Sequence, residues 1–279
     1  MHVAILGAKG MLGHALVQEF QGEEITAWDK EELDITDEQA VGEYLAALEP
    51  DIVMNAAAYT DVERAEDEPD EADAVNGHAV GNLAVTCGEA DIPLLHLSTD
   101  YVFQGTKGEG YAEDDEPMNP VNAYGRSKLL GETLLKETGK NFWLVRTAWL
   151  FGPHGKNFVE TIRERLNSTT TLRVVSDQHG SLTYTKDLAR ALHTLITDRA
   201  PYGTYHLINS GVATWADIAA EIARLLNKNI LIERIASADY QTKARRPLLS
   251  TLRNTKRPPL RPWNKAVADY LRNPRASAA

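Results

Sequence analysis

The sequence has a single cysteine, no long apolar run and fewer basic than acidic residues. With Cys87 as its only cysteine, the 279-residue chain cannot form an internal disulfide. No apolar stretch approaches the ~20 residues that a membrane-spanning helix needs. The N-terminal residues carry neither the basic segment nor the cleavage site of a secretory signal. We therefore expect a protein of the reducing cytoplasm that has no membrane partner.

The shortage of basic residues bears on the class of ligand. Lysine and arginine total 29 against 40 aspartates and glutamates, which gives a formal charge of -11. Nucleic acids and anionic membranes need a basic face, so neither is an expected partner. A small phosphorylated molecule needs only a few local cations and is not excluded. At 43% hydrophobic residues, the chain is able to bury a large core.

Short apolar runs alternate with helical patterns through the first half of the chain. The patterns predict strands at 2–7, 23–29, 51–58, 93–99 and 141–149, with helices between them, notably at 71–90 and 122–139. Such alternation is typical of an α/β fold with a parallel sheet covered on both faces. We predict a Rossmann-type doubly wound sheet over residues 1–150. Residues 151–279 should mainly form a smaller substrate-binding lobe, with some segments returning to the first domain and a disordered end at 272–279.

Three glycines follow the first predicted strand in "GAKGMLG". Gly7 permits a tight turn, Gly10 allows the backbone to approach a pyrophosphate, and Gly13 lets the helix pack close to the strand. Amide N–H groups at the start of this helix, around Met11 and Leu12, are suited to bind an anion. The spacing differs from the commonest dinucleotide fingerprint, and a purely structural turn also uses glycine. Its position directly after a strand favours an NAD(P)-binding site.

The end of the second predicted strand is suited to the adenosine half of such a cofactor. Asp29 stands where a carboxylate accepts hydrogen bonds from ribose hydroxyls and disfavours a 2′-phosphate. The adjacent Lys30 has the opposite preference, so the sequence leaves NADH and NADPH as alternatives. Asp34 and Ile35 are candidates to flank the adenine.

Tyr124 and Lys128 in "AYGRSK" lie one helical turn apart, so their side chains share a face. Alone, such a pair is common on helix surfaces. Beside a dinucleotide site it indicates a reductase, because hydride transfer to a carbonyl needs a proton donor and an ammonium group favours the tyrosinate. Ser98 and Thr99, at the end of the fourth predicted strand, supply a hydroxyl to orient the substrate oxygen.

The chain resembles the extended short-chain dehydrogenase/reductase family, and within it the dTDP-4-dehydrorhamnose reductases. The resemblance rests on "GAKGMLG", "NAAAYTDV", "STDYVFQG", "NAYGRSK" and "RTAWLFG" and extends over nearly the whole chain. It implies NADPH- or NADH-dependent reduction of the C4 keto group of dTDP-4-dehydro-L-rhamnose to dTDP-L-rhamnose. By similarity Thr99, Tyr124 and Lys128 are the catalytic residues. The alanines that let the cofactor lie along the third strand are Ala56, Ala57 and Ala58, and the sugar-nucleotide residues are Asp100, Tyr101, Trp149, Asn157 and Arg246.

The family resemblance has one departure. Some members share a magnesium ion between two subunits through acidic side chains, and the matching positions here are Ala15 and Lys186. Neither residue supplies a carboxylate, and a lysine repels the cation. We therefore predict no such metal, and a monomer or a weak homodimer. His96 and His179 receive no role from the sequence.

Three other readings remain open from the sequence. A related reductase that makes a different 6-deoxyhexose would share these motifs, because pocket shape determines the product sugar. A non-catalytic regulatory subunit of the methionine adenosyltransferase type has the same fold and a similar sequence. A plain NAD(P)-binding sensor would bind the cofactor without turnover. Oxidation of NAD(P)H with a keto-sugar nucleotide separates the enzymes from the other two.

Overall fold

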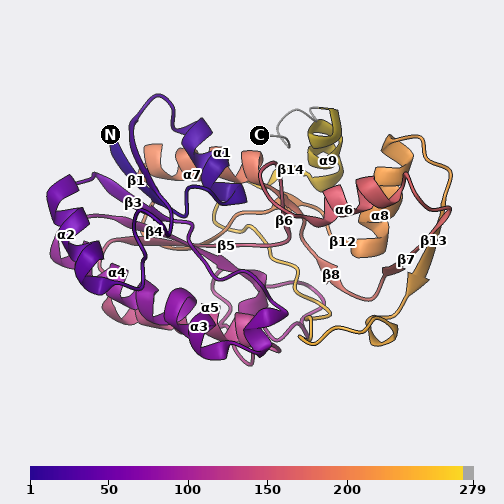
Figure 1. The fold of residues 1–279 in the computed structure, drawn as a ribbon, viewed down its shortest axis with the longest axis horizontal. Helices are drawn as coiled ribbons and strands as arrows, with labels where there is room; N and C mark the ends of the chain where they lie inside the picture. The colour runs from indigo at the N-terminus through magenta and orange to yellow at the C-terminus, as the bar shows by residue number, and fades with distance from the viewer. Residues whose placement is uncertain (273–279) are drawn as a thin grey trace.

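The computed structural model describes residues 1–272 and is built around a six-stranded sheet (Figure 1). The strands lie in the order β10-β5-β4-β3-β1-β2, and every pairing is parallel. Their bounds are β1 (His2–Leu6), β2 (Glu24–Trp28), β3 (Ile52–Asn55), β4 (Leu94–Thr99), β5 (Phe142–Thr147) and β10 (Gly203–His206). The predicted α/β fold with a doubly wound parallel sheet is confirmed. The strand order reverses at β1, and ligands of such sheets bind beyond the carboxyl ends of the strands there.

Helices cover both faces of this sheet, as Figure 1 shows. One face carries α1 (Met11–Glu19) and α7 (Thr185–Thr197), which pack on the apolar side chains of β1 and β5. The other carries α2 (Glu38–Leu48), α4 (Ala79–Glu89) and α5 (Ala123–Thr138). Because both faces are covered, β1, β3 and β4 are buried along almost their entire lengths. This explains their nearly continuous apolar sequences.

The helix predicted at 71–90 is interrupted. It consists of α3 (Pro69–Asp73), a π-helical turn (Ala74–His78) and α4, and a short 3-10 turn (Arg64–Glu66) precedes it. The turn places Asn76 inside the protein, where its Nδ2 donates to Ser127 Oγ on α5 and to the carbonyl of Tyr59. The segment after β3 is therefore tied to the helix that carries the predicted tyrosine and lysine.

The second half of the chain forms the lobe at the right of Figure 1. Its helices are α6 (Phe158–Arg165), α8 (Trp215–Leu225) and α9 (Trp263–Arg272). Short strands pair as β7 (Thr171–Val175) with β13 (Leu231–Ile235), β8 (His179–Gly180) with β12 (Ala213–Thr214), β6 (Leu150–Phe151) with β9 (Thr183–Tyr184), and β11 (Asn209–Ser210) with β14 (Leu260–Pro262). A capping box from Thr214 and Asp217 begins α8.

The two halves of the sequence interleave in space. Helix α7 and strand β10 come from the second half yet pack against and extend the central sheet. The segment at 243–263 returns toward the first half through isolated bridges that pair Leu249 with Thr106 and Leu252 with Tyr111. The division at residue 150 stays a prediction. The disordered end predicted at 272–279 lies outside the described residues, apart from Arg272, which ends α9.

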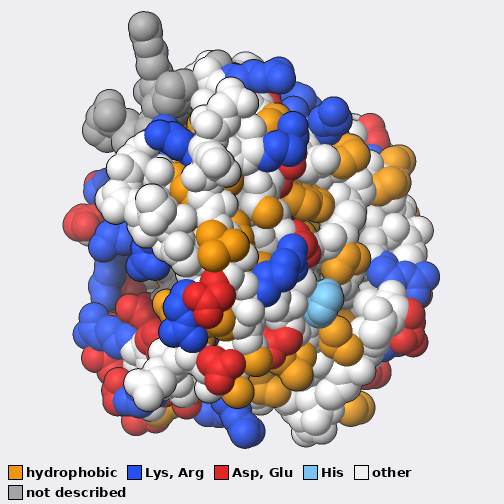
Figure 2. All heavy atoms as spheres, turned by 90° about the vertical axis from the view of Figure 1, so that its right-hand side faces the viewer, with side chains coloured by type: hydrophobic (Ala, Val, Ile, Leu, Met, Phe, Trp, Pro, Cys, Tyr) orange, Lys and Arg blue, Asp and Glu red, His pale blue; other side chains and the backbone are white. Residues whose placement is uncertain are grey.

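The surface at the lobe end mixes charges of both signs. Figure 2 shows acidic and basic side chains interspersed with apolar ones on this face, without a continuous basic patch. Within residues 1–272, no helix combines the length and apolar character that crossing a membrane demands.

Candidate active site

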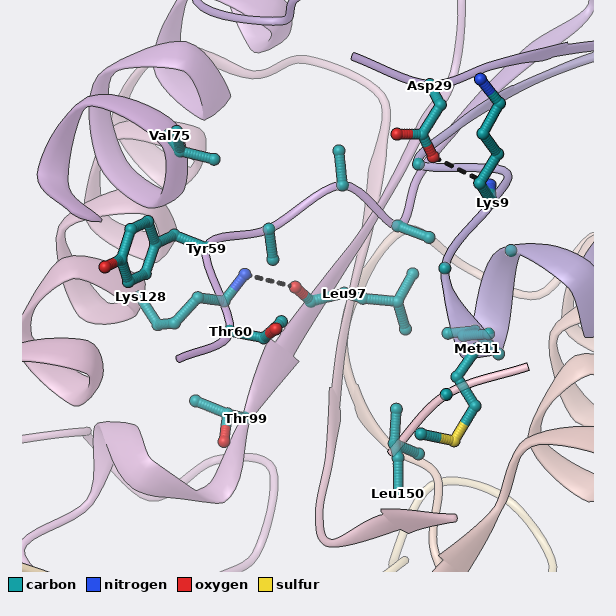
Figure 3. Close-up of a pocket in the computed structure, with 18 of the residues that line it drawn as sticks. Lys9, Met11, Asp29, Tyr59, Thr60, Val75, Leu97, Thr99, Lys128 and Leu150 are labelled. Atoms are coloured by element: carbon teal, nitrogen blue, oxygen red, sulfur yellow. Dashed lines mark hydrogen bonds between the residues drawn. The ribbon is translucent and has the colours of Figure 1, made fainter. Parts of the chain in front are cut away.

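A cavity of about 930 Å³ opens at the carboxyl ends of the central strands (Figure 3). Its walls come from Gly7 after β1, Ala56 after β3, Thr99 at the end of β4 and Thr147 at the end of β5. Every residue that the sequence predicts for the cofactor lines it: Gly7, Gly10, Met11, Leu12, Gly13, Asp29, Asp34, Ile35, Ala56, Ala57, Ala58, Tyr124 and Lys128. Its location is the one expected for ligands of a doubly wound sheet.

The glycine turn leaves room for an anion at the start of α1. A Cβ on Gly13 would lie 2.1 Å from the carbonyl oxygen of Gly7, so only glycine allows α1 to pack this close. Gly7 has a φ of +77° and sits against the backbone of Ala57. Gly10 is the N-cap of α1, and no side chain caps the helix there. The first amide N–H groups of α1 are therefore available to a pyrophosphate.

Asp29 is held beside this turn by the backbone. Its Oδ2 accepts from the amide of Lys9 at 2.8 Å and its Oδ1 from the amide of Lys30 at 2.9 Å. Figure 3 shows the carboxylate of Asp29 directed toward Lys9, at the edge of the cavity. The carboxylate is thus fixed at the wall of the cavity, beside the glycine turn.

Tyr124 occupies the first turn of α5, which Asn122 caps by accepting a hydrogen bond from the Gly125 amide at 2.7 Å. Burial raises the pKa of Tyr124 to about 12, and a hydrogen bond with Thr99 opposes this only in part. The Thr99 hydroxyl donates to Asp100 Oδ1 at 3.1 Å. Tyr124 and Thr99 both line the cavity, which brings a proton donor and an orienting hydroxyl to one place.

The structure separates the two hydroxyl candidates at the end of β4. Ser98 also lines the cavity, but its hydroxyl donates to the buried carboxylate of Glu132 at 2.6 Å. Successive residues of a strand point to opposite faces, so Thr99 has the other orientation, and it lines the cavity together with Tyr124. Thr99 is therefore the better placed of the two to meet a substrate oxygen.

Lys128 is 2% exposed and lies deeper than the sequence predicts. Its Nζ donates to the carbonyl of Leu97 at 2.7 Å, the contact marked in Figure 3. Burial lowers the pKa of Lys128 to about 8, although the charge of Glu132 raises it. The sequence predicts an ammonium that favours the tyrosinate. In the structure that ammonium turns toward the strand, and burial dominates the pKa of Tyr124.

Only one of the five predicted sugar-nucleotide residues lines the cavity. Trp149 does so with a φ of 45° and stacks on Trp215 at 3.7 Å between ring centroids. Tyr101 packs edge-on against Tyr124 at 5.9 Å, outside the lining. Asp100 is 1% exposed and accepts from Ser250 as well as Thr99.

The remaining two have evident structural roles. Asn157 caps α6 by accepting from the Glu160 amide, and its Nδ2 donates to two loop carbonyls. Arg246 forms an ion pair with Glu63. Their contact with a sugar nucleotide stays a prediction. The predicted lack of a shared metal and the oligomeric state also stay predictions.

Several lining residues were missed by the sequence reasoning. They are Lys9, Leu33, Tyr59, Thr60, Glu71, Val75, Leu97, Thr147, Ala148, Leu150, His154, Gly155 and Lys156. Tyr59 and Thr60 directly follow the three alanines, so their position in the motif was a usable signal. His154 was not predictable, since it comes from the loop after β6 and stacks on His14 of α1 at 4.1 Å between ring centroids.

Comparison with known proteins identifies the family. The family model for the RmlD substrate binding domain matches residues 1–275. The chain belongs to this family. A dTDP-4-dehydrorhamnose reductase of Streptomyces griseus is 40% identical over 284 residues, covering 98% of this chain and 90% of its own. The spore coat polysaccharide biosynthesis protein SpsK of Bacillus subtilis is 39% identical over 99% of this chain and 98% of its own.

Solved structures of the RmlD family agree with the fold. A Bacillus anthracis dTDP-4-dehydrorhamnose reductase in complex with NADP superposes with a TM-score of 0.93 at 34% identity, covering 98% of this chain and 99% of its own. The resemblance to this reductase family that the sequence motifs indicated is thereby confirmed.

Proposed function

We propose that this chain is an NAD(P)H-dependent reductase that converts the C4 keto group of dTDP-4-dehydro-L-rhamnose to the alcohol of dTDP-L-rhamnose. The observation that carries the proposal is the single cavity shared by the glycine turn and the Tyr124–Thr99 pair. Family membership and the names of the relatives support the same reaction. A regulatory subunit or a sensor has no need of a proton donor beside its cofactor.

The residues of the cavity fit a nicotinamide dinucleotide. The glycine turn and the open start of α1 would hold the pyrophosphate, Asp29 the adenosine ribose, and Ala56 to Ala58 the backbone along β3. When bound, the reduced nicotinamide supplies the hydride. Lys128 stands behind Tyr124 on α5, within reach of the nicotinamide ribose once its Nζ leaves the Leu97 carbonyl.

The chain's own residues supply the proton. Tyr124 gives its phenolic proton to the C4 oxygen of the sugar as negative charge develops there. Once its hydroxyl turns away from Asp100 Oδ1, Thr99 donates a hydrogen bond that orients the same oxygen. The positive charge of Lys128 stabilises the tyrosinate that remains. The low-dielectric surroundings that raise the pKa of Tyr124 keep the phenol protonated until the alkoxide forms.

The test is turnover by the purified chain. NADH and NADPH consumption is followed with enzymatically generated dTDP-4-dehydro-L-rhamnose, and the product sugar is identified. We expect consumption of cofactor and formation of dTDP-L-rhamnose. Formation of a different 6-deoxyhexose assigns the chain to a related reductase. Binding of NADH without any turnover contradicts the enzyme proposal and favours the regulatory subunit or the sensor.

The cofactor preference is predictable from the charges around Asp29. Lys9 Nζ is bound to Glu31 and Glu32 at 2.8 and 2.9 Å, and Lys30 Nζ lies 3.8 Å from Asp34. Together with Asp29, the region holds four carboxylates and two lysines, and both lysines are already paired. A 2′-phosphate would bring about two further negative charges here.

We therefore expect NADH to be preferred to NADPH by about tenfold in kcat/KM, the equivalent of about 1.4 kcal/mol. The measurement compares both cofactors at low ionic strength. Replacing Glu31 and Glu32 together by lysine should shift the ratio toward NADPH, whereas the distant Glu221→Lys on α8 should leave it unchanged. Equal use of both cofactors would contradict this prediction. A preference for NADPH would also contradict it and would agree with the NADP bound in the Bacillus anthracis structure.

The glycine turn yields a second prediction. In Gly10→Ala the new Cβ would meet only the Gly7 oxygen at 3.2 Å, so the fold should survive with a small change in Tm. NADH binding should weaken by about tenfold or more, because the methyl group occupies the approach of the pyrophosphate. Gly13→Ala should instead lower the Tm strongly, since its Cβ overlaps the Gly7 oxygen. Calorimetric titration with NADH and thermal melts distinguish the two variants. If Gly10→Ala bound NADH as tightly as the wild type, the pyrophosphate would have to bind elsewhere.

A further inference from the structure

His96 lies in the middle of β4 and is fully buried. Its ring stands between Asn55 at the end of β3 and Lys128 of the candidate active site. Its Nδ1 is 3.2 Å from Nδ2 of Asn55, the last residue of β3. Its Nε2 is 3.4 Å from Nζ of Lys128, whose other contact is the Leu97 carbonyl. The imidazole thus links Asn55, directly before Ala56, to Lys128, although no sequence motif indicates a role for it.

The contacts around Asn55 determine which nitrogen of His96 carries the proton. The backbone amide of Ala57 donates to Asn55 Oδ1 at 3.1 Å, and a backbone amide can only donate. The orientation of the Asn55 side chain is therefore fixed, and its Nδ2, also a donor only, faces His96 Nδ1. Nδ1 must then accept, which leaves the proton of a neutral ring on Nε2. Burial first, and then the charge of Lys128, hold the pKa of His96 well below its ordinary value, so the ring is neutral.

The geometry points to His96 as a positioning residue that controls the protonation of Lys128: its Nε2–H donates to the neutral amine and repels the ammonium. Burial of Lys128 acts in the same direction. The consequence for catalysis rests on the proposed reductase function. His96 sets the pH above which Lys128 loses the charge that supports Tyr124, and so sets the alkaline limit of turnover.

Other groups around Lys128 do not replace this interaction. On its own helix, Tyr124 lies one turn away and Glu132 raises the lysine's pKa. The Glu132 carboxylate is occupied by Arg146 of β5, at 2.9 and 2.7 Å. From β4 the facing groups are the Leu97 carbonyl and the imidazole of His96. Of these, only the imidazole nitrogen changes from repelling to attracting an ammonium when its tautomer changes.

The chain provides an internal control for the tautomer. The other buried imidazole, His206 of β10, faces the carbonyl of Arg253 with Nδ1 at 3.1 Å and Nη1 of Arg146 with Nε2 at 3.3 Å. A carbonyl only accepts and a guanidinium only donates, so His206 carries its proton on Nδ1. The two buried histidines should therefore show opposite tautomers.

The first test is nitrogen-15 NMR of the full chain labelled in histidine, at neutral pH and without cofactor. We expect the shifts of an Nε2–H ring for His96, assigned through contacts with Asn55, and of an Nδ1–H ring for His206, assigned through contacts with Arg253. An Nδ1–H ring or a charged ring at His96 overturns the proposal. This result does not depend on any enzymatic activity, so failure of the proposed function remains distinguishable.

The second test is the pH profile of kcat for NADH-dependent turnover. Turnover of the wild-type chain should fall as pH rises through about 8, where Lys128 loses its proton. In His96→Leu this alkaline fall in kcat should move to a pH higher by about 0.5 to 1 unit, because the N–H that repels the ammonium is gone. Asn55→Asp should move it the same way, since its carboxylate accepts a hydrogen bond from Nδ1–H, and the neutral ring then presents Nε2 as an acceptor.

The direction of the shift decides between the roles of His96. An alkaline fall that moves to lower pH shows that Nε2 was accepting from the ammonium, and an unmoved fall shows a purely structural histidine; either overturns the proposal. If neither variant folds, the NMR result on the wild-type chain decides alone. If the wild-type chain has no turnover, the proposed function fails while the tautomer assignment is still tested.

Discussion

Replacing Tyr124 with phenylalanine should lower kcat by about a thousandfold, within the range that general acids contribute. The phenolic proton is the one that the sugar alkoxide receives, and no second phenol is positioned to replace it: Tyr101 packs beside Tyr124 but does not line the cavity. Affinity for NADH, measured by titration in the absence of sugar, should stay within about twofold, because the glycine turn and Asp29 supply cofactor binding independently.

A second tyrosine of the same cavity is the matched control. The Tyr59 hydroxyl donates to Glu68 at 2.9 Å and is thus engaged away from proton transfer. Tyr59→Phe should therefore keep kcat within about tenfold of the wild type, a loss that one hydrogen bond explains. Thr99→Val should fall between the two. Turnover by Tyr124→Phe close to that of Tyr59→Phe would remove Tyr124 from the reaction.

Arg146→Met should lower the free energy of unfolding by about 3–5 kcal/mol, the usual result of breaking a buried ion pair on one side. Arg146 and Glu132 are 1% and 0% exposed, and two hydrogen bonds join them. Although burial opposes ionisation, the charge and hydrogen bonds of Arg146, together with Ser98, hold the pKa of Glu132 below its ordinary value. Without the arginine, the buried carboxylate keeps only the Ser98 hydroxyl and the partly exposed Lys136, whose Nζ lies 3.6 Å away.

A double variant separates the pair's net contribution from this penalty. Arg146→Met combined with Glu132→Leu removes both charges and should recover most of the lost stability, because apolar replacements of buried pairs are often close to neutral. Urea unfolding of the wild type, both single variants and the double variant gives the coupling energy. Losses that add up in the double variant would show that the two side chains stabilise the fold independently.

Local sequence patterns were sufficient for five of the six strands of the sheet and for choosing residues that line one cavity. A strand, a glycine turn and a helix are contiguous in the chain, so Gly7, Gly10 and Gly13 specify their own surroundings. Tyr124 and Lys128 share a helical face through spacing alone. The cavity accordingly collects all the residues assigned to the dinucleotide.

Contacts between distant segments could not be predicted from the sequence. The choice between Ser98 and Thr99 depends on Glu132, which α5 brings against β4 from 34 positions away. The depth of Lys128 depends on the Leu97 carbonyl and His96, neither of which any motif marks as a partner. The family resemblance assigns Arg246 to the sugar-nucleotide site. Its ion-pair partner is Glu63, which lies 183 positions away in the chain.

The most direct measurement of the central claim uses NADH that carries deuterium on the transferring face of its nicotinamide C4, with dTDP-4-dehydro-L-rhamnose as substrate. The account predicts that the purified chain forms dTDP-L-rhamnose with deuterium at sugar C4, seen by NMR and mass spectrometry. The same label should be almost undetectable with Tyr124→Phe in the same time. Retention of all deuterium in NADH, with the sugar unreduced, would contradict the reductase account.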